Sequence, residues 1–219
     1  MSVLLTRGTR LSQPQGPVEV DWASYPTCSL AVSQYYDFAA KALLSKTGTK
    51  LSPATNGIVT GFGSTSGVSS TDKVTTTLTR YAQRRTYLVV ALSHASGGGG
   101  SLGRLFEKRT AGAQSELFYK DDSSGLSHYG RAFSGSAGQW AFTSPSNDRW
   151  HVYIVRYDSG SISNVPVIWV DGVTQSLTTF YSPSGTLIDN SDPYTIGNRA
   201  SDSLRNWSGQ IALVSAFDS

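Results

Sequence analysis

One stretch of the chain decides the fold class: Val165-Pro166-Val167-Ile168-Trp169-Val170-Asp171-Gly172-Val173-Thr174-Gln175-Ser176-Leu177-Thr178-Thr179-Phe180. An apolar run at residues 165–170 and a second strand-like segment at 173–180, rich in Thr, flank the dipeptide Asp171-Gly172. Both central residues of a two-residue hairpin turn need a positive φ, and Asp-Gly is a preferred pair for that turn. The stretch therefore predicts a β-hairpin.

Further strand patterns lie on both sides of this hairpin. Apolar and polar residues alternate over 150–157, and residues 85–93 form an apolar run that suits a central strand. Residues 34–45 fit a helix, or equally a strand followed by a turn. Additional strands are predicted at 71–80, 103–109, 115–120, 127–133, 139–143, 194–197 and 207–217. Many strands without intervening helices predict an all-β protein, with two antiparallel sheets packed as a sandwich.

The composition agrees with one all-β domain. Charged residues make up 15% of the 219 residues and there are 22 glycines, which favours short strands joined by tight turns. The single cysteine, Cys28, cannot form an internal disulfide. His94, His128 and His151 show no pairing in the sequence that would make this thiol a nucleophile.

Residues 1–27 differ from the rest of the chain. Three prolines punctuate a polar, partly basic segment, and proline favours extended backbone that donates no ladder hydrogen bond. We therefore expect an extended N-terminal arm over residues 1–27, followed by the sandwich domain over 28–219. Arg7, Arg10 and Trp22 are the residues through which the arm would dock onto a partner.

Charge and hydropathy narrow the classes of partner. The short apolar stretch Val3-Leu4-Leu5 predicts no signal peptide, and no apolar run reaches the length of a membrane helix. Residues 1–110 carry 12 Lys and Arg against 5 Asp and Glu, whereas residues 111–219 carry 6 against 10. Because the two halves carry opposite net charge, head-to-tail contact between copies in a homo-oligomer is compatible with the sequence. The basic residues do not gather as a nucleic-acid surface requires, so neither nucleic acid nor a membrane is an expected partner.

Four ordered motifs in the second half resemble the concanavalin A-like lectin/laminin G-like jelly roll. The resemblance implies that Trp150 and Trp207 fill the core, and Gly209 would permit a bend in the last strand. The motifs are Asp148-Arg149-Trp150-His151-Val152-Tyr153, Ile168-Trp169-Val170-Asp171-Gly172-Val173, Tyr194-Thr195-Ile196-Gly197-Asn198 and Trp207-Ser208-Gly209-Gln210-Ile211.

Residues 10–22 resemble the start of laminin G-like proteins encoded by tailed phages and prophages. This resemblance implies a structural or adhesive protein of the virion, such as a capsid decoration, head-fibre or tail component. Its partners would be other virion proteins of the capsid or tail and surface glycans, and its location would be the virion. The alternative function is a free-standing carbohydrate-binding lectin.

Some relatives with this fold are glycoside hydrolases, which need two carboxylates that flank the scissile bond. Glu19 and Asp21 begin the E-x-D-x-x-E pattern of the retaining glucanases, but Ser24 stands at its last position. Glu107 and Glu116 lie on facing strands, where they could approach each other, yet ordinary surface ion pairs with nearby basic residues explain them better. The chain is therefore predicted not to be an enzyme.

Two further sites follow from residue type. Calcium is a common cofactor in relatives of this fold, and Asp189, Asp192 and Asp202 would supply its oxygen ligands, although Asp is also an ordinary turn residue. Sugars stack on exposed aromatic rings. Tyr129 and Trp140 lie on predicted strands without a clear family role, so they are the candidates for exposed ligand-binding residues, although the sequence favours a structural role for each.

Overall fold

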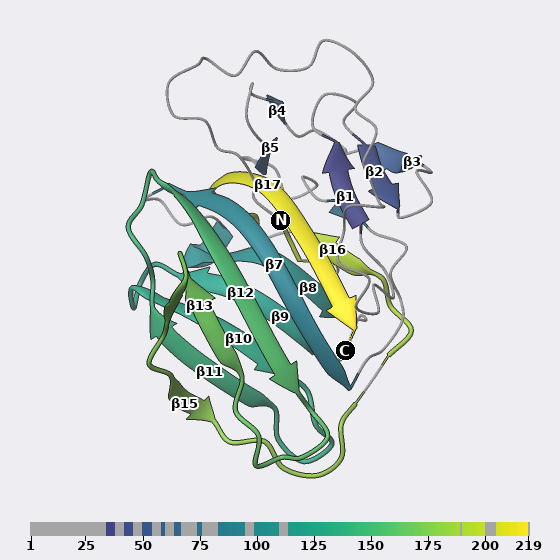
Figure 1. Cartoon of the computed structure of the whole chain (residues 1–219), viewed down its shortest axis with the longest axis vertical. Helices are drawn as coiled ribbons and strands as arrows, with labels where there is room; N and C mark the ends of the chain where they lie inside the picture. The colour runs from purple at the N-terminus through teal and green to yellow at the C-terminus, as the bar shows by residue number, and fades with distance from the viewer. Residues whose placement is uncertain are drawn as a thin grey trace.

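The structure, a computed structural model, describes residues 34–37, 42–45, 50–53, 58–59, 64–66, 74–75, 83–94, 99–109, 114–188, 190–199 and 205–218. These residues form two seven-stranded sheets and one three-stranded sheet. Figure 1 shows the two large sheets as two layers of a sandwich. The predicted fold class, an antiparallel two-sheet sandwich, is confirmed.

Sheet I is the layer at the back of Figure 1. Its order is β15 (Thr178–Tyr181), β11 (Gly138–Thr143), β10 (Leu126–Arg131), β9 (Gln114–Asp121), β8 (Leu102–Arg109), β16 (Tyr194–Ile196) and β6 (Val74–Thr75). All its neighbouring strands pair antiparallel. A short 3-10 turn, Gly99–Ser101, precedes β8.

Sheet II is the layer at the front. Its order is β14 (Val173–Thr174), β13 (Val167–Val170), β12 (Trp150–Asp158), β7 (Arg84–Ser93), β17 (Gly209–Asp218), β5 (Ser64–Ser66) and β4 (Ile58–Val59). Its strands also pair antiparallel. The apolar run at residues 85–93 becomes β7, a central strand as predicted.

The segment 34–45 is a pair of strands and not a helix. β1 (Gln34–Asp37) pairs antiparallel with β2 (Ala42–Ser45), and β3 (Lys50–Pro53) completes the three-stranded sheet. Of the two alternatives for this segment, the helix is wrong. The predicted arm, with Arg7, Arg10 and Trp22, lies outside the described residues.

The Asp171-Gly172 turn forms as predicted, with φ of 51° and 82°. The second strand is much shorter than expected, because β14 ends at Thr174. The chain then crosses to the other layer, where β15 pairs with β11 of sheet I. Residues 173–180 therefore contribute to both sheets, and their prediction as one strand is wrong.

The core between the sheets is rich in aromatic rings, and one of the two tryptophans expected there is present. Trp207 is buried, and its indole N–H donates to the Leu92 carbonyl at 3.0 Å. Trp150 instead lies half-buried on the outer face, because the alternation of β12 turns His151, Tyr153 and Val155 inward. The prediction that Trp150 fills the core is therefore wrong: its neighbour His151 points inward and Trp150 points outward.

Two features of position 209 require glycine: its backbone conformation and its close approach to a neighbouring strand. Its φ is 142°, and a Cβ at this position would lie 1.9 Å from the Leu92 carbonyl oxygen. Only glycine allows β17 to approach β7 so closely where the two strands begin to pair.

A buried carboxylate, Glu116 of β9, joins the two sheets. It accepts hydrogen bonds from Arg131 and Tyr129 of β10 and from Tyr194 of β16. The Tyr194 oxygen in turn accepts from Arg85 of β7 at 2.9 Å. The hydroxyl of Tyr87, also on β7, lies 2.7 Å from the same Tyr194 oxygen. The chain of contacts therefore runs from sheet I to sheet II.

The surroundings of Glu116 favour its charged form. Burial by itself raises the pKa of Glu116, but the attraction of Arg131 and Arg85 and the hydrogen bonds from the two tyrosines outweigh that effect. The pKa of the carboxyl therefore lies below its ordinary value of 4.5. Glu116 and Arg131 form a buried ion pair, and not the surface pair expected from the sequence.

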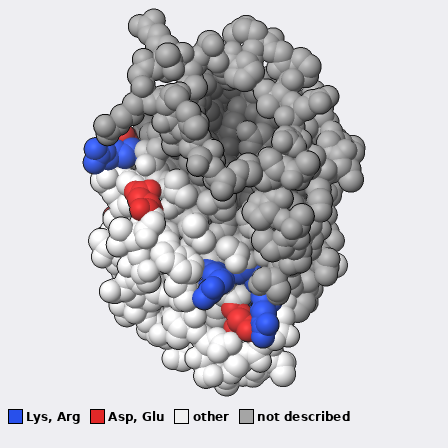
Figure 2. Space-filling model, in the orientation of Figure 1, with Lys and Arg blue, Asp and Glu red and all other residues white. Residues whose placement is uncertain are grey.

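The outer face of sheet II is poor in charge. Leu88 and Val90 of β7, Val152 and Ile154 of β12, and Trp169 of β13 stand on this side of their strands. Figure 2 shows this side of the molecule, where one group of charged side chains lies in the lower half and a smaller group lies at the upper left. The same face carries Arg156 and the Arg84–Asp158 ion pair, so it is apolar along part of β7, β12 and β13 and charged at one end of them.

Replacing Glu116 tests the importance of the buried network for stability. Glu116→Gln keeps the shape of the side chain but leaves Arg131 buried without its counter-ion, so the free energy of unfolding should fall by about 3 kcal/mol. Urea denaturation measures this loss. The matched control, Asp158→Asn, breaks the exposed ion pair with Arg84 and should cost much less. Equal losses in the two variants would contradict the assignment.

The lowered pKa of Glu116 also predicts how its contribution depends on pH. A carboxyl whose pKa is lower in the folded protein stabilises the fold above its unfolded pKa, and that stabilisation is lost as the pH falls through the folded value. The difference in unfolding free energy between wild type and Glu116→Gln should be full at pH 7 and shrink below the ordinary value of 4.5. Denaturation at several pH values checks it, and a difference that grows on acidification would contradict it.

Candidate functional site

An irregularity in β8 sets which side chains reach the outer face of sheet I. Arg104 pairs with Tyr119 and Phe106 pairs with Phe118, so Leu105 is an extra residue in the ladder. Such a bulge shifts the alternation of side chains by one position. Arg104 and Glu107, three residues apart, therefore share the outer face, whereas Phe106 lies in the core.

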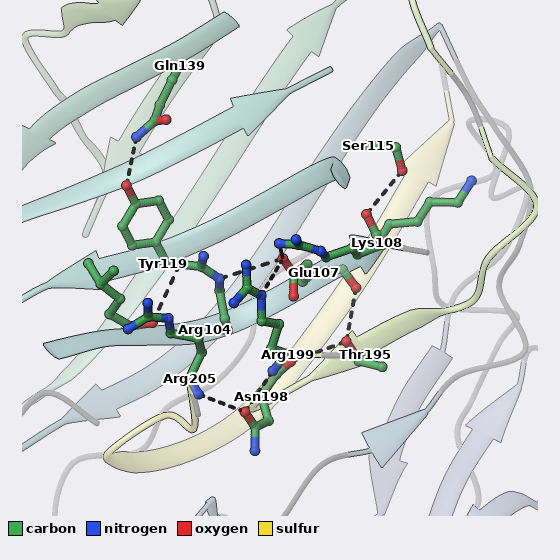
Figure 3. Close-up of polar contacts among 12 residues, drawn as sticks. Arg104, Glu107, Lys108, Ser115, Tyr119, Gln139, Thr195, Asn198, Arg199 and Arg205 are labelled. Atoms are coloured by element: carbon green, nitrogen blue, oxygen red, sulfur yellow. Dashed lines mark hydrogen bonds and ion pairs between the residues drawn. The ribbon is translucent and has the colours of Figure 1, made fainter. Parts of the chain in front are cut away.

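Three guanidinium groups converge on one carboxylate oxygen on this face. Glu107 Oε1 lies 3.9 Å from Arg104 Nε, 3.7 Å from an Arg109 nitrogen and 3.9 Å from Arg199 Nε. Arg205 lies beside them, and Figure 3 shows Arg104, Arg199 and Arg205 together with Glu107. We call Arg104, Arg109, Arg199 and Arg205 the arginine cluster.

The turn after β16 positions two members of the cluster. The side-chain oxygen of buried Asn198 accepts hydrogen bonds from the backbone N–H groups of Arg199 and Arg205, at 2.8 and 3.2 Å. Arg205 also donates to the Gly100 carbonyl at 3.1 Å. Asn198 thereby brings together two arginines that are six positions apart in the chain.

From Arg104, a row of stacked side chains crosses the outer face of sheet I. The Arg104 guanidinium lies 4.3 Å from the centre of the Tyr119 ring. Tyr119 stacks on His128 with ring centres 4.6 Å apart, and His128 meets the edge of Phe180 at 5.3 Å. We call Arg104, Tyr119, His128 and Phe180 the cross-strand row, because its members come from β8, β9, β10 and β15.

Gln139 of β11 fixes the middle of this row. Its amide donates to the Tyr119 hydroxyl at 2.7 Å and lies 3.0 Å from His128 Nδ1. Figure 3 shows Gln139 pointing toward the Tyr119 hydroxyl. The row is closed by packing at Arg104, which is 5% exposed, and open at Phe180, which is 51% exposed next to Tyr181 at 54%.

Burial changes the protonation equilibria along the row. It lowers the pKa of Arg104 to about 10, an effect that Glu107 opposes and that Arg199 and Arg205 reinforce. Burial also lowers the pKa of His128, with Arg104 acting in the same direction and Asp121 against it. His128 is therefore a neutral ring at pH 7, which suits its stacking between two aromatic groups.

Both predicted ligand-binding aromatics lie in the core, so their prediction as exposed residues is wrong. Tyr129 and Trp140 are each 1% exposed and pair across β10 and β11 on the inner face of sheet I. Their chain neighbours His128 and Gln139 occupy the outer face. The predicted strands were therefore right, but each residue was one position away from the face that carries the site.

The predicted calcium ligands are only partly described. Asp192 is half-buried, while Asp189 and Asp202 lie outside the described residues. Among the residues that are described, no three His, Cys, Asp or Glu side chains gather closely enough to hold a metal ion. The calcium site stays a prediction.

Glu107 and Glu116 cannot serve as a pair of catalytic carboxylates. Glu107 is opposite Leu117 in the ladder and Glu116 is opposite Lys108, an offset of one residue. Because side chains alternate, Glu107 lies on the outer face and Glu116 between the sheets. A glycoside hydrolase needs both carboxylates on the same bond, which this arrangement does not allow.

Two of the three histidines have acidic partners that the sequence did not reveal. His94 lies 2.6 Å from Asp148, and His151 lies 2.7 Å from Asp171. Ser146 Oγ lies 3.5 Å from His151 Nε2, which is reminiscent of a hydrolytic triad. That nitrogen is also 2.9 Å from the Ser146 carbonyl oxygen. Nε2 thus lies closer to the Ser146 carbonyl oxygen than to the Ser146 hydroxyl, so the hydroxyl-to-imidazole hydrogen bond of a triad is not formed here.

No protein-family model and no curated protein match the chain. Solved structures do match it. Sialidase from Trypanosoma rangeli aligns with a TM-score of 0.63 and 10% identity, over 88% of this chain but only 31% of that protein. This chain is therefore similar to less than a third of the sialidase.

Two smaller binding modules show the same likeness. The CBM40 domain of the Ruminococcus gnavus IT-sialidase, solved with α2,3-sialyllactose, gives a TM-score of 0.51 and 10% identity, over 74% of this chain and 89% of that domain. Domains LG4-5 of the mouse laminin α1 chain give 0.50 and 14%, over 80% of this chain and 48% of the laminin pair. At such low identity the likeness shows the fold alone: an antiparallel two-sheet sandwich of the kind found in laminin G and CBM40 domains.

Proposed function

We propose that the chain is a non-enzymatic module that binds glycans through the outer face of sheet I. The observation that carries this proposal is the open end of the cross-strand row. Phe180 and Tyr181 expose about half of their surface there, next to the polar side chains of Gln139 and Tyr119. An exposed ring beside fixed donors and acceptors is what a sugar needs, because one face of a pyranose is apolar and its hydroxyls are not.

The rigidity of the row adds support. Each ring from Tyr119 to Tyr181 rests on the next, and Gln139 holds Tyr119 and His128 in place. A preformed surface loses little conformational entropy when a ligand binds. The row is also carried on strands of a sheet, which hold their side chains more firmly than loops do.

Several structurally similar proteins bind carbohydrate. The Trypanosoma rangeli sialidase has been solved with sialic acid, and the Ruminococcus gnavus CBM40 domain with sialyllactose. In this chain Glu107 and Glu116 lie on opposite faces of sheet I, and His151 Nε2 lies closer to the Ser146 carbonyl than to its hydroxyl; both observations support binding without hydrolysis.

Truncation of Phe180 tests the proposed face. Removing a half-exposed ring that would stack on a sugar should weaken glycan binding about tenfold. A glycan array with the full chain identifies the ligand, and titration calorimetry with that ligand compares wild type with Phe180→Ala. The matched control is Val173→Ala, an exposed apolar residue on sheet II, which should keep wild-type affinity. Absence of binding to every glycan, or equal affinity of the two variants, would contradict the proposal.

We propose in addition, from the resemblance of residues 10–22, that the module is part of a tailed-phage virion. In this proposal the N-terminal arm and one sheet edge contact capsid or tail proteins, and the outer face of sheet I stays free for surface glycans. The apolar part of the outer face of sheet II, around Val152, is consistent with a protein that makes protein contacts. The alternative is a free-standing lectin, which uses the same face of sheet I without the virion.

Deletion of the N-terminal arm distinguishes a virion protein from a free-standing lectin. If the chain is a virion protein held by its arm, density-purified particles of the source phage should contain the full chain and lack a variant without residues 1–26. Mass spectrometry of the particles measures both. Calorimetry on the deletion variant provides the control, since its glycan affinity should not change. Absence of the full chain from particles, or equal amounts of both chains, would contradict the arm-docked virion protein.

A further inference from the structure

The arginine cluster holds more positive charge than its described surroundings neutralise. Arg104, Arg109 and Arg199 share a single carboxylate oxygen, that of Glu107. Arg205 pairs with a backbone carbonyl, and its charge acts on Arg104. Leaving Arg199 aside, the guanidinium groups of Arg104, Arg109 and Arg205 therefore face one described carboxylate, that of Glu107.

The cluster is also short of hydrogen-bond acceptors. The Nε atoms of Arg104, Arg109 and Arg205 are buried and have no hydrogen-bond partner. The three contacts to Glu107, at 3.7 to 3.9 Å, are too long for hydrogen bonds. A buried polar N–H without an acceptor costs free energy, and the cost is larger for a charged group. An additional acceptor with negative charge would remove this cost.

From this imbalance we infer that the arginine cluster binds an anionic group, a carboxylate or a sulfate, carried by the glycan. The inference rests on the proposed function and specifies its ligand as an acidic glycan. Planar guanidinium groups match the two oxygens of a carboxylate or sulfate with paired hydrogen bonds. A metal ion is excluded from the same place because four positive side chains would repel it.

The geometry of sheet I sets the size of such a ligand. Arg104 lies on β8 and Phe180 on β15, and β9, β10 and β11 lie between them. Neighbouring strands are about 4.8 Å apart, so four spacings separate the two ends of the cross-strand row. The acidic group would sit at the closed end and a sugar ring at the open end, so the ligand is an oligosaccharide and not a single sugar.

Three lactose-based probes test the inference on the full chain. Lactose is neutral, α2,3-sialyllactose adds a carboxylate, and sulfated lactose adds a sulfate. In calorimetry at constant ionic strength, at least one acidic probe should bind ten or more times more tightly than lactose, and the stronger of the two identifies the anionic group. Binding of both acids to the same degree would mean that the cluster selects charge alone, which also supports the inference.

Variants locate the effect. Arg109→Gln removes one charge from the more exposed rim of the cluster and should reduce the preference for acidic probes at least fivefold, while the affinity for lactose stays the same. Arg156→Gln, an exposed arginine on sheet II, is the matched control and should keep the full preference. Thermal melts with inorganic sulfate give an independent measure: sulfate should raise the midpoint of wild type more than that of Arg109→Gln.

Each failure has a distinct meaning. If all three probes bind equally and Phe180→Ala weakens them, the anion inference is overturned and the glycan-binding proposal survives. An acidic preference that Arg109→Gln leaves intact would overturn the assignment to the arginine cluster. If no glycan binds at all, the proposed function and this inference are both overturned.

Discussion

The sandwich depends on one carboxylate that is buried away from water. Glu116 stands between the sheets, and its charge is compensated by Arg131 and by the hydroxyls of Tyr129 and Tyr194. Through the Tyr194 oxygen the compensation extends to Arg85 and Tyr87 on the opposite sheet. Removing a partner from a buried charge is strongly destabilising. These strands therefore pair in the register that brings all the groups together.

That register has a consequence on the other side of sheet I. With Glu116 and Phe118 held inward, alternation along β9 turns Tyr119 outward, where it pairs with Arg104 and His128. The cross-strand row is thus the outer counterpart of the buried network. The same strands build both, which explains why a ligand-binding surface on this sheet would be rigid.

The two groups of charges in sheet I are balanced differently. Around Glu116, each oxygen of the carboxylate accepts hydrogen bonds, and the group makes sense as part of the folded protein alone. Around Glu107, the guanidinium groups of Arg104 and Arg109 lie beyond hydrogen-bond distance, and the buried Nε–H groups of Arg104, Arg109 and Arg205 lack an acceptor. Natural folds rarely leave such groups without a partner. The contrast suggests that stability explains the inner charges and that recognition explains the outer ones.

The sequence by itself determined the class of the fold. Asp171-Gly172 predicted the turn, the apolar run at 85–93 predicted a central strand, and Trp207 and Gly209 were correctly given structural roles, because each depends on local conformation or on residue type. Only the tertiary structure decided the face on which each side chain lies. Tyr129 and Trp140 were one residue away from His128 and Gln139, and the Leu105 bulge that unites Arg104 with Glu107 leaves no mark in the sequence pattern. The physical reason is the two-residue period of a strand: one step of register or one bulge exchanges core and surface, and only pairing with neighbouring strands determines it.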